Sequence, residues 1–138
     1  MSKVEKGRTV CRAGLALFYG AAGVLHIAFP QPFLHITPQW VPNPDAAILL
    51  TGVCEIIGAI ALFVPSLRTY AGVGLAIYAV CVYPANIKHA IDTLSAGNAS
   101  VWMWLYHLVR LPLQPLIVWL ALFAGALISW PFGKTSLR

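Results

Sequence analysis

Charged residues are scarce in this sequence, and acidic residues are the scarcest. Only 9% of the 138 residues are charged, and four acidic residues stand against nine basic ones. A soluble globule of this size needs more polar surface, because its outside must stay in contact with water. Hydrophobic residues make up 59% of the chain, and the mean hydropathy is +0.78. The composition therefore predicts an integral membrane protein.

Cysteines are also few, and they follow no redox or metal-binding pattern. Cys11, Cys54 and Cys81 lie in or beside apolar segments without a C-x-x-C pair, so we expect them to be packing residues. A redox pair formed by Cys54 and Cys81 is the alternative. The sequence has no nucleotide-binding loop, no G-x-S-x-G turn and no haem-attachment motif. Any redox cofactor would thus be a bound small molecule or belong to a partner, and whether the chain is an enzyme stays open.

Four segments are apolar and long enough to cross a bilayer, whose hydrocarbon core of ~30 Å needs about 20 helical residues. They cover residues 9–29, 45–64, 68–90 and 101–130. Prolines between residues 30 and 44, a Pro-Ser turn at 65–66 and a polar loop at 95–100 separate them. We predict an all-α fold, a four-helix transmembrane bundle that forms one domain over residues 1–138.

Basic residues indicate how this bundle is oriented in the membrane. They gather in both tails and in the turn after the second segment, at Lys3, Lys6, Arg8, Arg12, Arg68, Lys134 and Arg138. Because cytoplasmic loops carry an excess of such residues, we expect both termini to be cytoplasmic. The first segment lacks a small-x-small cleavage site and is as long as a full span, so we expect it to be retained. The net charge of +5 suits anionic lipid headgroups, and no basic-aromatic pattern indicates nucleic acid.

Ionisable residues inside the apolar segments are the best indication of function. With a rise of 1.5 Å per residue, Glu55 and Arg110 lie about 15 and 14 Å below the outer ends of their helices. Either charge alone costs about 2.5–3.5 kcal/mol at the bilayer centre. We therefore predict that Glu55 and Arg110 form an ion pair, or share a buried ligand or water.

Helical spacing places other polar residues near these two. On the second segment, small and polar residues at i, i+3, i+4 and i+7 form one face around Glu55, which we expect to turn inward. On the fourth, three polar residues at i, i+3 and i+7 share a face. The predicted ligand-binding residues, all in the outer half of the bundle, are His26, Glu55, Asn86, His89, His107, Arg110 and Gln114.

Two other interpretations of these residues stay open. Polar side chains often serve only as contacts between membrane helices, and a buried ion pair can fix helix register without chemistry. A metal site made of His26, His89, His107 and Glu55 is a weaker alternative, because no two of them stand in a local metal-binding pattern. We predict no metal site.

Several short strings carry a resemblance to a known family. They are GVLH at 23–26, FP at 29–30, ITP at 36–38, WVP at 40–42, TGVCEIIGA at 51–59, YPANIKHA at 83–90 and RLPLQ at 110–114. With these strings, the chain resembles the DoxX-like family of small bacterial membrane proteins from about residue 14 to residue 114. The resemblance implies site residues at Glu55, Asn86, His89, Arg110 and Gln114, to which we add His26.

The resemblance also implies a location, the bacterial inner membrane as a multi-pass cell-membrane protein, and a function. The family's namesake is similar to a subunit of an archaeal thiosulfate:quinone oxidoreductase, and other relatives are linked to redox homeostasis or to membrane-protein assembly. We expect a protein that binds a hydrophobic small molecule, a quinone or a lipid, in a polar pocket in the outer half of the bundle, in a redox setting. The alternative is a non-catalytic membrane subunit or assembly factor. Expected partners are membrane lipids, the hydrophobic ligand and a redox or membrane protein, while a homo-oligomer stays open.

Overall fold

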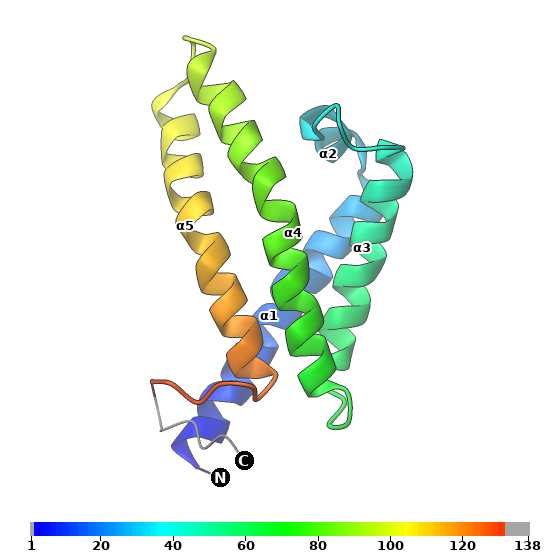
Figure 1. Ribbon diagram of the computed structural model, residues 1–138, viewed down its shortest axis with the longest axis vertical. Helices are drawn as coiled ribbons and strands as arrows, with labels where there is room; N and C mark the ends of the chain where they lie inside the picture. The colour runs from blue at the N-terminus through cyan, green and yellow to red at the C-terminus, as the bar shows by residue number, and fades with distance from the viewer. Residues whose placement is uncertain (1, 132–138) are drawn as a thin grey trace.

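The structure, a computed structural model, describes residues 2–131 of the chain and is built from helices (Figure 1). In chain order these are α1 (Lys3–Ala28), α2 (Gln31–Ile36), α3 (Pro44–Ala61), α4 (Arg68–Ser95) and α5 (Val101–Ala124). All except the short α2 are long and apolar enough to cross a membrane. The predicted all-α, four-helix transmembrane bundle is therefore confirmed, and the protein is a multi-pass membrane protein.

The helix ends differ from the predicted ones where local hydrogen bonds decide them. α1 begins earlier than predicted because the Ser2 hydroxyl accepts a hydrogen bond from the Glu5 N–H at 3.2 Å and so caps the helix. α4 continues through Pro84 as far as Ser95. α5 ends at Ala124 rather than at residue 130, because the chain leaves the helix in a turn at Gly125.

The short α2 was not predicted. It lies among prolines, which the sequence pattern identified only as helix breakers. Proline is tolerated in the first helical turn, where its missing N–H would have no helical partner. Pro32 occupies this place, and the helix then ends after one and a half turns at Ile36.

The four long helices form two antiparallel pairs, α1 with α3 and α4 with α5 (Figure 1). Glycines allow the helices of each pair to approach closely. A Cβ atom on Gly23 would lie 2.6 Å from the carbonyl oxygen of Gly52, and one on Gly72 would lie 2.7 Å from the carbonyl oxygen of Ala121. Such close backbone contact holds membrane helices together by van der Waals packing, since lipid supplies no hydrophobic driving force between them.

The two pairs meet at one end and spread apart at the other (Figure 1). We call the end with the start of α1 and the α3–α4 turn the closed end, and the end with α2 and the α4–α5 loop the open end. Toward the closed end Leu75 of α4 packs on Gly58 of α3, where a Cβ would lie 2.5 Å from the leucine side chain. Leu62, fully buried, joins the same core. The tight contacts between the pairs thus lie away from the open end.

Arginine side chains reinforce the closed end. The Arg12 guanidinium is 4% exposed, donates from Nε to the Ala124 carbonyl oxygen at 2.9 Å and binds Glu5 Oε1 at 2.6 Å. Arg8 donates to the Ile128 carbonyl oxygen at 3.1 Å. Because Ala124 is the last residue of α5, its carbonyl has no partner within the helix. Arg12 satisfies that carbonyl and joins α1 to α5.

Candidate functional site

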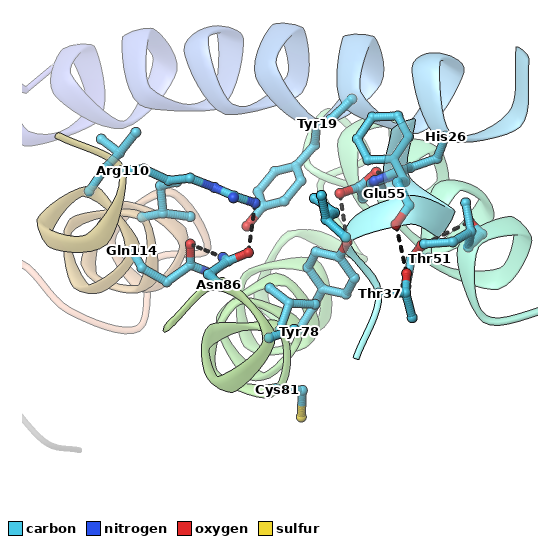
Figure 2. A pocket seen from close by; sticks show the side chains of 18 of the residues that line it. Tyr19, His26, Thr37, Thr51, Glu55, Tyr78, Cys81, Asn86, Arg110 and Gln114 are labelled. Atoms are coloured by element: carbon cyan, nitrogen blue, oxygen red, sulfur yellow. Dashed lines mark hydrogen bonds and ion pairs between the residues drawn. The ribbon is translucent and has the colours of Figure 1, made fainter. Parts of the chain in front are cut away.

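A cavity of about 740 Å³ lies between the two helix pairs toward the open end. All five helices contribute to its lining, and most of the lining side chains are apolar or aromatic, among them Phe18, Phe33, Trp102 and Tyr106. The polar side chains form two clusters on opposite sides of the space, shown in Figure 2. One is centred on Glu55 and the other on Arg110.

The Glu55 cluster joins three helices. Glu55 of α3 is 4% exposed, and both of its carboxylate oxygens have protein partners. Oε2 lies 2.6 Å from Nδ1 of His26 on α1, and Oε1 accepts a hydrogen bond of 2.6 Å from the hydroxyl of Tyr78 on α4. The His26 ring also packs edge-on against Phe33 of α2, with 4.0 Å between ring centroids. Each carboxylate oxygen of Glu55 thus has a partner within the protein.

The Arg110 cluster is a chain of side-chain amides. Figure 2 shows the Arg110 side chain extending toward Asn86, and its Nη2 donates to the Asn86 Oδ1 at 2.6 Å. The Asn86 Nδ2 donates to the Gln114 Oε1 at 3.2 Å, and the Gln114 Nε2 donates to the Ala79 carbonyl oxygen at 2.7 Å. This chain ends on the α4 backbone, so it fixes the direction of the guanidinium.

One nitrogen of this guanidinium has no partner among the described residues. Arg110 Nη1 is buried and makes no hydrogen bond within residues 2–131. The guanidinium carbon lies over the ring of Tyr106, 5.5 Å from its centroid. A buried donor without an acceptor is costly in a membrane interior, where water is absent. Arg110, which lines the cavity, therefore has one hydrogen-bond donor without an acceptor.

The predicted direct ion pair between Glu55 and Arg110 is wrong. Within the described part of the chain, Glu55 pairs with His26, and Arg110 pairs with no acidic side chain. Two residues at the same depth in the bilayer can still lie far apart in the plane of the membrane, so equal depth does not establish a contact. Here the helix pairs spread apart, so the two residues line the same cavity from different sides. A ligand or water shared between them stays a prediction.

The other predicted residues fall into two groups. His26, Glu55, Asn86, Arg110 and Gln114 all line the cavity. The remaining two, His89 and His107, are not among its lining residues and pack on each other instead, with 4.9 Å between ring centroids. The inward face predicted around Glu55 is confirmed, since the glycines and the alanine that share it, Gly52, Gly58 and Ala59, are buried with it.

Sequence reasoning missed Tyr78 and Tyr19, which also line the cavity. Both lie in apolar segments, where a tyrosine is common and does not by itself indicate a binding site. A periodic signal was nevertheless present. Tyr78 precedes Asn86 by eight residues, and Tyr19 precedes His26 by seven, so each shares a helix face with a residue already singled out.

The alternative metal site is not formed by the described residues. Within residues 2–131, no group of three or more His, Cys, Asp or Glu side chains is placed to hold a metal ion. His26 meets Glu55, whereas His89 and His107 meet each other. The three cysteines are free, so Cys54 and Cys81 form no disulfide.

Comparison with known protein families gives a match over most of the chain. The family described as a domain of unknown function (DUF8561) matches residues 15–124 of the chain. No curated protein and no solved structure matches it. The matched range contains both polar clusters of the cavity. The DUF8561 match does not link the chain to the DoxX-like family, so the DoxX-like resemblance stays a prediction.

Proposed function

The chain belongs to the DUF8561 family, whose description assigns no activity, and we propose that it binds a hydrophobic small molecule, such as a quinone or a lipid, in the cavity. One observation carries the proposal: a space of about 740 Å³ with mostly apolar walls also holds a fixed, incompletely satisfied arginine. Sites for small molecules commonly have volumes of roughly 300–1,000 Å³, apolar walls and a few polar groups that orient the ligand.

Each part of the cavity has a role in such binding. Arg110 lines the cavity and its guanidinium keeps one donor without a partner, so we assign to it an oxygen of the ligand, either a quinone carbonyl or an oxygen of a lipid headgroup. The aromatic side chains of Phe18, Phe33 and Trp102 suit the apolar part of the same molecule. On the opposite side, His26 and Tyr78 carry exchangeable protons beside Glu55, as the reduction of a quinone would require. The redox setting itself stays a prediction that rests on the DoxX-like resemblance.

We also propose that the closed end faces the cytoplasm of a bacterial inner membrane. Arg8, Arg12 and Arg68 all lie at the closed end, where α1 and α4 begin. The excess of basic residues on the cytoplasmic side supports this orientation. Lys134 and Arg138, which entered the same expectation, lie outside the described residues. In this orientation, the cavity belongs to the outer half of the bundle.

Native mass spectrometry of the protein released from membranes in mild detergent tests the ligand proposal. Two neighbouring alanines of α1 provide matched variants. Ala22 lines the cavity, whereas Ala21 is exposed and is not among the lining residues. We expect the wild type and Ala21→Phe to retain a small molecule in near-stoichiometric amount. We expect Ala22→Phe to lose it, because the added ring occupies the binding space.

The opposite results would favour the alternative function. A wild type that carries no small molecule, or equal retention in all three proteins, would remove the cavity as a binding site. The protein would then be better described as a non-catalytic subunit or assembly factor.

A further inference from the structure

Arg110 is a half-buried positive charge on a membrane-spanning helix, and the described residues leave it no acidic partner. The chain contains only four acidic residues. Glu5 pairs with Arg12, Glu55 with His26, and Asp92 with Lys88. The fourth, Asp45, is exposed in the first turn of α3 and is not among the residues that line the cavity.

The groups that do surround Arg110 cannot neutralise it. Asn86 is a neutral amide, and Tyr106 offers the face of its ring. His107, one turn earlier on the same face of α5, and His89 beside it supply no negative charge. Arginine also cannot escape the cost of burial by losing its proton. The positive charge therefore persists inside the protein.

We infer that the ligand supplies the missing counter-ion, so that it is an amphiphile with an anionic oxygen head, a carboxylate or a phosphate. This inference rests on the proposed function and narrows its ligand class. The planar guanidinium suits two parallel hydrogen bonds to such a head. The chain of amides through Asn86 and Gln114 holds the guanidinium in place before the ligand arrives. On the opposite side of the cavity, Glu55 accepts a hydrogen bond from Tyr78 and contacts His26 Nδ1, so that side presents a carboxyl group rather than a second guanidinium to the head.

Ligands that share one apolar chain and differ in the head test the inference. Delipidated protein in a non-ionic detergent is titrated with oleate and with oleyl alcohol, and binding is followed by native mass spectrometry. We expect oleate to bind roughly tenfold to a hundredfold more tightly, as for hydrogen bonds to a charged group. Arg110→Gln should abolish this preference, because it weakens the binding of oleate far more than that of the alcohol, whereas Arg110→Lys should keep part of the preference.

A second cation near the open end provides the control. Lys88 lies on α4 and already pairs with Asp92 at 2.6 Å, and it is not among the residues that line the cavity. Lys88→Gln removes one positive charge without touching the site, so the preference for oleate should be unchanged. A preference lost equally in Lys88→Gln would show general surface attraction and would overturn the assignment to Arg110.

Titrations with other ligands identify the source of the anionic head. Tighter binding of dioleoyl phosphatidylglycerol than of oleate would assign it to a membrane phospholipid, and the reverse to a free fatty carboxylate; either result supports the inference. Acetate and inorganic phosphate test the head alone, and they should bind far more weakly than the amphiphiles.

Two outcomes separate this inference from the proposed function. Equal affinity of the wild type for oleate and oleyl alcohol would overturn the anionic head and leave ligand binding in place. Failure of oleate, the alcohol, the phospholipid and ubiquinone alike to bind would overturn both. If Arg110→Gln does not fold, the comparison of acid and alcohol on the wild type decides alone.

Discussion

The closed and open ends of the bundle each hold an arginine within a membrane-spanning helix, and they treat it in opposite ways. At the closed end, Arg12 has a carboxylate partner in Glu5 and a helix carbonyl at Ala124. At the open end, Arg110 has a neutral amide in Asn86 and a free Nη1. The first arginine is part of the scaffold, because its charge is satisfied. The second is held in position but left unsatisfied, as a binding residue should be.

The packing of the helices also differs between the closed end and the open end. Near the closed end, Gly72 and Gly125 bring α4 and α5 into backbone contact, and Leu75 fills the space beside Gly58. Toward the open end, the same four helices enclose the cavity. This arrangement would allow the proposed ligand to enter at the open end without a change in the core, since tightly packed interiors resist change of volume.

The largest expected effect tests the contrast between the two arginines. Arg12→Gln should lower the free energy of unfolding by about 2–3 kcal/mol, because it strands the Ala124 carbonyl and leaves Glu5 with only its longer contact to Arg8, at 3.6 Å. Arg110→Gln should cost less than about 1 kcal/mol, because it removes a charge that has no acidic partner. Unfolding in detergent by titration with sodium dodecyl sulfate measures both values. Equal losses would mean that Arg110 is as structural as Arg12.

A smaller effect tests the packing at the closed end. Gly72→Ala should destabilise the bundle by about 1–3 kcal/mol, because the new Cβ would lie 2.7 Å from backbone atoms of Ala121 and Gly125. Gly74→Ala is the control on the same helix, since a Cβ there meets nothing within 4 Å. It should be neutral or stabilising by less than about 1 kcal/mol, as alanine favours the helix. Melting temperatures in detergent would show the difference, and a tolerated Gly72→Ala would argue that the closed end is loosely packed.

The same contrast explains how far the sequence could be interpreted. The spans and the inward face around Glu55 were predictable, because length and periodicity are properties of one helix at a time. The partner of Glu55 was not, because it depends on how far apart two helices lie. For the same reason, the sequence indicated for Arg12 only a role in the orientation of the protein in the membrane. Its partner Glu5 is a local residue, but the carbonyl that it satisfies belongs to α5, more than a hundred residues away.

The smallest expected effect concerns the coupling between residues across the cavity. In a double-mutant cycle, Glu55→Gln and His26→Gln should show a coupling of about 0.5–3 kcal/mol, because the two side chains are in contact at 2.6 Å. Glu55→Gln and Arg110→Gln should couple by less than about 0.5 kcal/mol in the protein without ligand, because each charge has different partners. The cycle is measured by unfolding of delipidated protein. Strong coupling between Glu55 and Arg110 would mean that the two sides of the cavity act as one ion pair, and Arg110 would then have no unmet charge to offer an anionic ligand.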